Sequence, residues 1–169
     1  MTQTGNSEAP KEASASVIAR HAATLKALPF SDTSDFDDAA RGFLGTLDGA
    51  RITTAQGRVV WSLEPYGFLS STEAPATVNP SLWRQSRLNM NHGLFEVVPG
   101  VYQVRGLDIA NMTLIEGERG VIVVDTLTSI EGARAAMELY FCASRPAAGG
   151  RGDLYPHPYG PLGRRARRA

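Results

Sequence analysis

Cysteine is almost absent from this chain of 169 residues, in which Cys142 is the single thiol. One cysteine cannot form an intramolecular disulfide, so the fold does not depend on an oxidising compartment. No apolar run approaches the roughly 20 residues that a membrane-spanning helix needs. The polar, acidic start of the chain also lacks the apolar core of a secretory signal. These absences predict a cytoplasmic protein with no membrane partner.

Net charge is absent too, because 17 basic residues balance 17 acidic residues. The two signs are unevenly distributed along the chain. Acidic residues outnumber basic ones over residues 1–150, whereas the last 19 residues contain five arginines and one aspartate. The overall composition is that of an ordinary globular protein, long enough for one domain with a sizeable core. The tail therefore differs in composition from the body of the chain.

Three helices are predicted in the first half of the sequence. Apolar residues recur at helical spacing from about residue 14 to residue 28 and stop at Pro29. Capping oxygens and first-turn acids at residues 34–38 predict a second, short helix. Asn79 and Pro80 supply the cap and the first position of a third helix. His21 is interpreted as a helix residue without a ligand role, since no other metal-binding side chain lies one turn away. His92 is expected in the last turn of the third helix, where it is favourable against the helix dipole, and is not assigned a catalytic role.

Strands are predicted on both sides of the third helix. Residues 51–54 and 58–63 flank a turn at Gly57 and predict a hairpin, while residues 65–75 are expected to be irregular. Three later runs rich in β-branched residues are separated by glycine and charged residues, which is typical of an antiparallel meander. These runs are residues 100–105, 111–116 and 120–124.

The last of these runs is apolar from Val121 to Val124, which predicts a strand buried on both faces. Residues 128–131 match a capping box, and an apolar stripe predicts a helix from there to about Phe141. A further strand is expected after this helix. Strand, capped helix and strand would together form half of a layered α/β domain.

Four segments of the chain resemble the linear primary alkylsulfatases, which belong to the metallo-β-lactamase superfamily. They are residues 35–43, residues 74–85, the string NHGLFEV at residues 91–97 and the string NMTLIEG at residues 111–117. The resemblance extends from about residue 28 to residue 140 and therefore concerns the N-terminal portion of the family. Thr126 is a departure, since proline is expected there in this family.

The resemblance implies a zinc-dependent hydrolase of alkyl sulfate esters, homodimeric when intact, with two zinc ions. The implied fold class is α/β, an incomplete metallo-β-lactamase-type αββα sandwich with an N-terminal helical extension and an irregular C-terminal tail. Family members carry zinc ligands on a His-x-His-x-Asp-His motif after the next strand, where paired cations hold and activate a hydroxide. That motif is missing here, so we assign no catalytic residue, no metal ligand and no cofactor to this chain and expect it to be inactive.

Asp125 is the single residue to which the resemblance gives a supporting role. It follows the third strand of the meander, where α/β proteins place their sites, and it is expected to brace the metal-binding loop without touching the metal. A polar residue at a strand end that caps the local backbone is an equally good interpretation.

The tail suggests a frameshift. When the codons from Ala147 onward are re-read from their second base, they permit the string Ala-Val-Ile-Tyr-Thr-His-Thr-His-Thr-Asp-His. That string is a buried strand followed by the missing metal motif. We therefore predict four segments: a disordered lead-in (1–14), a helical and hairpin extension (15–95), the first strands and helix of a metallo-β-lactamase-like domain (96–141) and an irregular, out-of-frame tail (142–169).

Two other functions remain open from the sequence. The sheet edge after Val124 could recruit a partner strand, which would make the chain a non-catalytic interaction module. The basic tail at residues 164–168 could bind nucleic acid through phosphate contacts. Both hypotheses are weaker than the family resemblance, so the expected partner is an alkyl sulfate substrate and not a nucleic acid.

Overall fold

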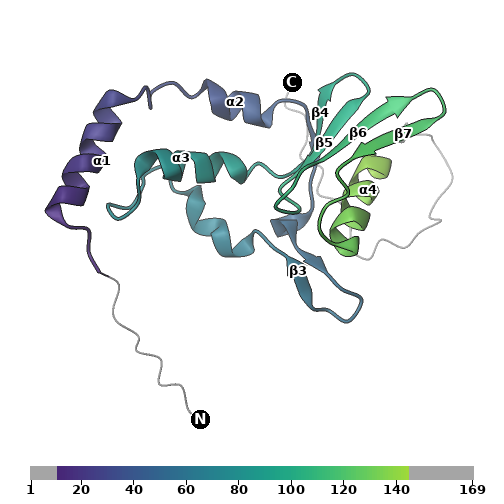
Figure 1. The fold of residues 1–169 in the computed structure, drawn as a ribbon, viewed down its shortest axis with the longest axis horizontal. Coiled ribbons are helices and arrows are strands. Elements are labelled where there is room, and N and C mark those ends of the chain that lie inside the picture. The colour runs from purple at the N-terminus through teal and green to yellow at the C-terminus, as the bar shows by residue number, and fades with distance from the viewer. Residues whose placement is uncertain (1–10, 145–169) are drawn as a thin grey trace, which may run out of the picture.

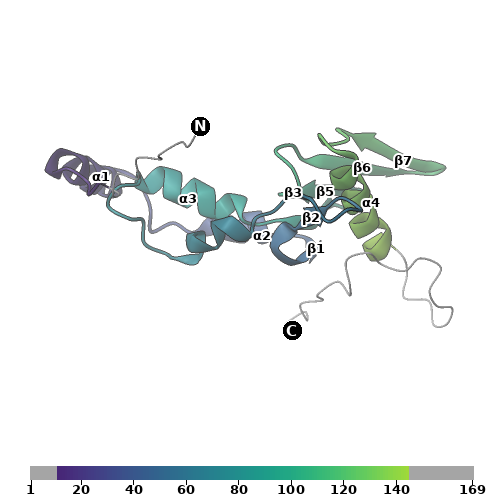
Figure 2. The same ribbon diagram turned by 90° about the horizontal axis from the view of Figure 1, so that it is seen from below.

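The computed structural model describes residues 11–144, and it places a sheet with one packed helix at one end and a helical segment at the other (Figure 1). Seen from below, the helical segment, which comprises residues 15–40 and 64–89, extends away from the sheet as a separate arm (Figure 2). The expected fold class is confirmed at the level of a mixed helix and sheet protein. Most of the predicted lead-in and nearly all of the predicted tail lie outside the described residues.

The predicted helices of the first half are present. Helix α1 spans Ala15–Ala27 with Ser14 as its N-cap, α2 spans Ser34–Ala40, and α3 spans Pro80–Asn89. The Asn79 side chain accepts a hydrogen bond from the N–H of Ser81, as expected of a cap before proline. The first part of the segment expected to be irregular is instead a short 3₁₀ helix, η2, at Glu64–Ser70, whereas residues 71–75 are irregular as expected.

The arm is held together largely by Arg84 of α3. Its guanidinium donates to both carboxylate oxygens of Asp35 and to the carbonyl oxygen of Phe30, and lies over the rings of Phe30 and Phe36. A planar guanidinium can make these bidentate and stacked contacts simultaneously, which a lysine cannot do. Asp35, in the first turn of α2, therefore anchors α3 in addition to its place at the start of its own helix.

The main sheet has five antiparallel strands in the order β1-β4-β5-β6-β7. Their bounds are Phe43–Gly45, Gly93–Val98, Val101–Arg105, Met112–Gly117 and Gly120–Val124. A separate hairpin consists of β2 (Ile52–Thr53) and β3 (Val59–Trp61), with a short 3₁₀ turn, η1, at Asp48–Ala50 before it. The predicted meander and hairpin are thus confirmed.

The expected boundary at residue 96 falls inside β4, so β1 and the first three residues of β4 lie within the predicted extension. The hairpin region also contributes to the core, because Leu47, Ala50 and Ile52 are buried with residues of the sheet and α4. Residues before position 96 thus contribute to the same sheet and core as the strands that follow.

Helix α4, at Ile130–Ser144, packs on one face of the sheet. Tyr140 lies edge-on to Tyr102 of β5 and donates a hydrogen bond to Glu116 of β6. Leu114 of β6 is fully buried beneath this helix. The core is a single layer of side chains between the sheet and α4, with the hairpin closing one end.

The start of α4 is one residue later than the capping box predicts. Ser129 is the cap, because its hydroxyl accepts a hydrogen bond from the N–H of Gly132. Thr128, the expected cap, instead donates both its N–H and its hydroxyl to Asp108. The helix also continues past Phe141 to Ser144.

The prediction that Val121 to Val124 is buried on both faces is wrong for the described chain. These residues form β7, the last strand of the sheet, and it pairs only with β6. Because Val123 pairs with the buried Leu114, Val121 and Val123 point toward α4 and their neighbours point away. Ile122 is 63% exposed and Val124 is 53% exposed. An apolar edge strand of this kind is a template for pairing with another chain.

Replacing Ile122 with lysine is expected to suppress aggregation of the purified chain, because a charge on an edge strand opposes edge-to-edge pairing. The exposed position predicts a change of less than about 0.5 kcal/mol in the free energy of unfolding. Light scattering on heating would measure the effect. Ile18→Lys on α1 adds the same charge away from the sheet, and an equal gain from that variant would contradict the role of the edge.

Candidate functional site

Asp125, the residue predicted to support a metal site, lies exposed in the turn between β7 and α4. Its backbone has a φ of 64°, and its carboxylate accepts a hydrogen bond of 2.8 Å from the N–H of Leu127. Aspartate tolerates this left-handed conformation because its side chain can bond to the nearby backbone. The contact observed at Asp125 is therefore a local turn, which agrees with the capping interpretation.

The two histidines in the described part of the chain lie apart from each other. His21 Nδ1 is 3.0 Å from the carbonyl oxygen of Ala76, and His92 Nδ1 is 2.8 Å from that of Met90. A carbonyl oxygen only accepts hydrogen bonds, so each Nδ1 acts as the donor. His92 follows the end of α3, just before β4, and does not lie in the last helical turn.

Within residues 11–144, no group of three or more histidine, cysteine, aspartate or glutamate side chains converges as a metal site would require. A structural zinc site needs four such ligands and a catalytic one needs at least three. The described residues therefore do not fit the zinc ions that the family resemblance implies.

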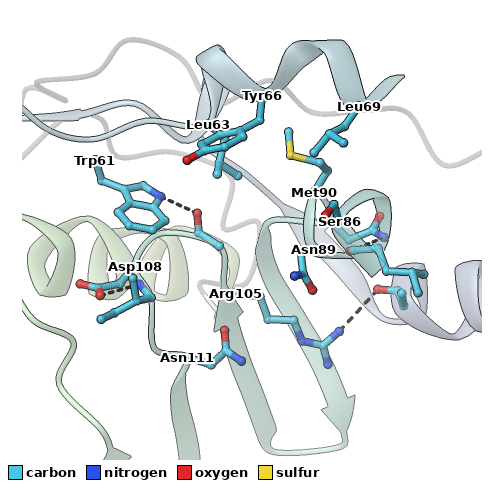
Figure 3. A pocket seen from close by; sticks show the side chains of 15 residues that line it. Trp61, Leu63, Tyr66, Leu69, Ser86, Asn89, Met90, Arg105, Asp108 and Asn111 are labelled. Carbon is cyan, nitrogen blue, oxygen red and sulfur yellow. Dashed lines mark hydrogen bonds between the residues drawn. The ribbon is translucent and has the colours of Figure 1, made fainter. Parts of the chain in front are cut away.

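A cavity of about 480 Å³ lies between the arm and the end of the sheet (Figure 3). Leu63, Tyr66 and Leu69 lie on one side of it, and Arg105, Asp108 and Asn111 lie on the other. This volume is within the range of small-molecule sites, as is the combination of an apolar wall with a few polar groups. The cavity is the candidate site of the described chain.

Two close contacts hold the segments around the cavity together. The indole N–H of Trp61 in β3 donates a 2.8 Å hydrogen bond to the carbonyl oxygen of Gly106, which ties the hairpin to the segment after β5. Gly106 has a φ of 70°, and a β-carbon there would lie 2.5 Å from the β-carbon of His92. Glycine is thus required at this point because the two segments approach too closely for a side chain.

Arg105, at the end of β5, is a cation in the cavity wall without an acidic partner. Its Nε donates to Gln103 at 2.6 Å, Nη1 is 3.4 Å from the carbonyl oxygen of Ala39, and the guanidinium carbon lies 4.4 Å from the ring centre of Phe95. Among the described residues it forms no salt bridge. Burial lowers the pKa of Arg105, yet an arginine remains charged at neutral pH.

Asp108 is the one buried charged residue found among residues 11–144. One carboxylate oxygen accepts from the N–H and hydroxyl of Thr128 at 2.9 and 2.7 Å, and the other accepts from the N–H of Ile109 at 2.6 Å. Burial by itself raises the pKa of Asp108, but the hydrogen bonds from Thr128, Ile109 and Ala110 outweigh it and hold the pKa below its ordinary value. Asp108 therefore fixes the start of α4 to the cavity wall and has little capacity left for a ligand.

Sequence reasoning missed both Arg105 and Asp108. Neighbouring residues of a strand point to opposite faces, so Arg105 lies on the face opposite to the buried Val104. The arm residues that complete the cavity are distant in the chain. Asp108 is the one charged residue in the otherwise apolar segment 106–110. This pattern indicates only weakly that its carboxylate is buried and hydrogen-bonded. Its partner Thr128 is 20 residues away, so their contact could not be predicted.

A scan against models of protein families found no match. No helix in the described part of the chain is long and apolar enough to cross a membrane.

Comparison with curated proteins found sulfatases. The chain is 53% identical over 131 residues to an (R)-specific secondary-alkylsulfatase of Pseudomonas sp., a match covering 78% of this chain and 20% of that protein. An alkyl/aryl-sulfatase of Saccharomyces cerevisiae is 46% identical over 149 residues, covering 88% of this chain and 23% of the relative. A linear primary-alkylsulfatase of Pseudomonas sp. is 45% identical over 140 residues, covering 82% and 21%.

Comparison with solved structures agrees. A stereoselective inverting sec-alkylsulfatase from Pseudomonas sp. matches with a TM-score of 0.73 and 54% identity, over 80% of this chain and 21% of that chain. The chain thus spans about one fifth of the length of the relatives that it matches. At this level of identity over most of its residues, the chain belongs to the alkylsulfatase family, of which it represents an N-terminal portion.

Proposed function

We propose that this chain is a portion of a zinc-dependent alkyl sulfate ester hydrolase and that it does not hydrolyse sulfate esters by itself. The observation that carries the proposal is the 53% identity to an alkylsulfatase over 131 residues. The proposed inactivity is supported by the residues present, since the described part offers no converging set of metal ligands. No catalytic step is therefore assigned to a residue of this chain.

The proposed architecture of the intact protein is a metallo-β-lactamase-type αββα sandwich. Two observations support it. Helix α4 covers one face of the sheet, and apolar side chains remain exposed on the opposite face, among them Ile115, Ile122 and Val124. A second sheet lying on that face would bury these side chains, as the inner faces of layered domains do. In such a domain Asp125 would lie at the end of β7 and is proposed to brace the adjoining metal loop.

The frameshift remains a proposal about the gene. The residues from Ala147 onward, whose codons permit the His-x-His-x-Asp-His motif in another frame, lie outside the described residues. The gene sequence across the codons for residues 141–147 would test it directly. An authentic reading frame without those histidine codons would contradict the frameshift.

The proposed function predicts a difference between two purified proteins. One is this chain, and the other is the product of the same gene with one base restored near the codons for residues 141–147. Zinc content by atomic absorption and hydrolysis of hexyl and octyl sulfate are expected only in the restored protein, because the metal motif would be present only there. Stoichiometric zinc together with hydrolysis by this chain would overturn the proposed inactivity. A restored protein that binds zinc without cleaving any sulfate ester would overturn the proposed activity.

A second candidate function rests on the exposed edge of β7. The chain could act as an interaction module by adding a strand from a partner to this edge. This hypothesis is supported by the outer edge of β7, which is apolar and has no strand beside it among the described residues. Binding of nucleic acid through the basic tail stays a prediction, because the tail lies outside the described residues. If the tail binds nucleic acid, the affinity should fall steeply with added salt.

A further inference from the structure

The open edge of β7 carries backbone groups in a fixed alternation. Among the described residues β7 is the last strand of the sheet and pairs only with β6 (Figure 1). Gly117 and Gly120 close the hairpin of β6 and β7 around a two-residue turn, and the closing pair of such a hairpin is a hydrogen-bonded pair. Hydrogen-bonded pairs alternate along an antiparallel ladder. Val121 and Val123 therefore direct their N–H and C=O groups away from β6, toward the open edge.

Apolar side chains on this strand are accessible to another chain. Ile122 is 63% exposed, Val124 is 53% exposed and Val123 is 36% exposed. Helix α4 packs chiefly against β1, β4 and the β2–β3 hairpin, toward the other edge of the sheet. Neighbouring side chains of a strand point to opposite faces. A strand added beside β7 would therefore cover apolar side chains on both faces of the sheet.

Opposite charges flank β7 at its two ends. Arg119 precedes the strand in the exposed turn, and the exposed Asp125 follows it. Neither residue forms a salt bridge within the described part of the chain, and one carboxylate oxygen of Asp125 accepts from the N–H of Leu127. If β7 pairs with itself in an antiparallel arrangement centred on Ile122, Arg119 of each copy lies opposite Asp125 of the other. Opposite charges in this position stabilise a pair of strands.

The backbone and the charges select the same register. With Ile122 opposite its own copy, Val121 lies opposite Val123 of the second copy, and both direct backbone groups into the new ladder. A shift by one residue would place outward-directed groups opposite residues whose groups are already bonded to β6. A shift by two residues would separate Arg119 from Asp125. The edge is therefore complementary to itself in one register.

We propose that β7 of this chain binds β7 of a second copy, antiparallel and centred on Ile122, so that the two sheets become one continuous sheet. Both copies use the same surface, and such a contact closes after two copies. The proposal deepens the second candidate function, on whose open edge it rests, and it is independent of the proposed hydrolase function. One short strand from each copy is a small interface, so the dissociation constant is expected to be on the order of 1–100 µM.

Sedimentation velocity of the full 169-residue chain, at concentrations on both sides of that range, tests the proposal. A reversible equilibrium between monomer and dimer is expected. A chain that stays monomeric at every concentration, as it would if its own residues outside the described range covered β7, would overturn the proposal. Assembly beyond the dimer would overturn it as well, because pairing of β7 with the opposite edge at β1 does not close.

Cysteine cross-linking tests the register. In the proposed pairing Ile122 and its copy occupy a non-hydrogen-bonded position, where α-carbons are about 4.5 Å apart and a disulfide can form. Ile122→Cys in a Cys142→Ser background is therefore expected to give a disulfide-linked dimer on mild oxidation. Val124→Cys in the same background is the matched control, because Val124 and its copy would lie about 13 Å apart along the ladder. Equal cross-linking of the two variants would contradict the proposed register.

Charge variants test the ends of the interface. Arg119→Glu replaces both attractions by repulsions and is expected to weaken the dimer roughly tenfold. Arg58→Glu, an exposed position in the β2–β3 hairpin, makes the same change in charge and should dimerise normally. Adding Asp125→Asn to Arg119→Glu removes the repulsion and keeps an acceptor for the N–H of Leu127, so part of the affinity should return. Equal effects of Arg119→Glu and Arg58→Glu would show that the flanking charges do not pair and would overturn the proposal.

These outcomes are separate from catalysis. If Ile122→Cys cross-links as expected but the restored longer protein has no sulfatase activity, the inference stands and the hydrolase proposal fails. If the restored protein hydrolyses alkyl sulfates but this chain remains monomeric, the inference fails and the hydrolase proposal stands.

Discussion

Replacing Leu114 with alanine is expected to lower the free energy of unfolding by about 2–5 kcal/mol, the range for truncating a fully buried leucine. Leu114 has no exposed surface and lies at the centre of β6, beneath α4. The core is a single layer, so few neighbouring side chains can move in to fill the space that the truncation leaves. The loss is comparable with the total stability of many small domains. We therefore expect the variant to be largely unfolded at physiological temperature.

Urea denaturation followed by circular dichroism measures this effect. Leu82→Ala is the matched control, because Leu82 lies on α3 with 60% of its surface exposed. That variant should change the free energy of unfolding by no more than about 0.5 kcal/mol. If the two alanine variants unfold at the same urea concentration, the single-layer core described above is not what stabilises the chain.

Replacing Asp108 with asparagine is expected to destabilise the chain by about 1–3 kcal/mol at neutral pH, the cost of leaving buried donors without an acceptor. The asparagine has the same shape, but one of its two oxygens becomes an NH₂ group that only donates. The N–H groups of Ile109 and Thr128 and the hydroxyl of Thr128 all need an acceptor there. The connection between the cavity wall and the start of α4 would then be weakened.

The effect of Asp108→Asn should depend on pH, and its sign follows from the lowered pKa of Asp108 in the folded chain. A carboxylate with a lowered folded pKa contributes stability above its ordinary pKa and loses it as the pH falls through the folded value. The difference in unfolding free energy between the natural chain and the variant should therefore shrink as the pH falls below about 4. The pKa of Asp32 is lowered too, by hydrogen bonds from Ser34, but Asp32 is present in both proteins and cancels in the comparison.

Thermal or urea unfolding of both proteins across this pH range provides the measurement. Asp37→Asn, which changes an exposed acid in the first turn of α2, is the control for the loss of one negative charge. A stability difference for Asp108→Asn that stays constant down to acidic pH would contradict the role of the charged carboxylate.

Much of the local structure could be predicted from the sequence because its determinants are close together in the chain. Ser14 before an apolar periodic segment and Asn79 before Pro80 each started a helix where expected. Gly57 closed the hairpin through its positive φ of 83°. The capping box was misplaced by one residue because Thr128 has a stronger partner, the buried carboxylate of Asp108, than its own helix terminus.

The failures concern packing between distant segments. Four consecutive apolar residues at Val121 to Val124 indicate burial on both faces, but burial depends on what covers the strand. In the described chain the face of β7 that carries Ile122 and Val124 stays exposed. The boundary at residue 96 ignored β1, whose three residues are too short to show a period. Arg105 and Tyr66 belong to elements far apart in sequence, so no local pattern could bring them to one cavity. The predicted metal-related role of Asp125 depends on residues that the described chain does not contain.

The strand order has a consequence for the sequence of folding events. Three of the four pairings in the main sheet, β4–β5, β5–β6 and β6–β7, join strands that follow each other directly in the chain, so each of them closes only a short loop. Short loops cost little chain entropy, and contacts of low sequence separation form rapidly. The pairing of Phe43 with Phe95 instead closes a much longer loop, which contains the hairpin, η2 and α3. During synthesis β1 therefore emerges long before its partner, and the meander can assemble on itself as soon as β7 leaves the ribosome, with β1 joining as the last strand.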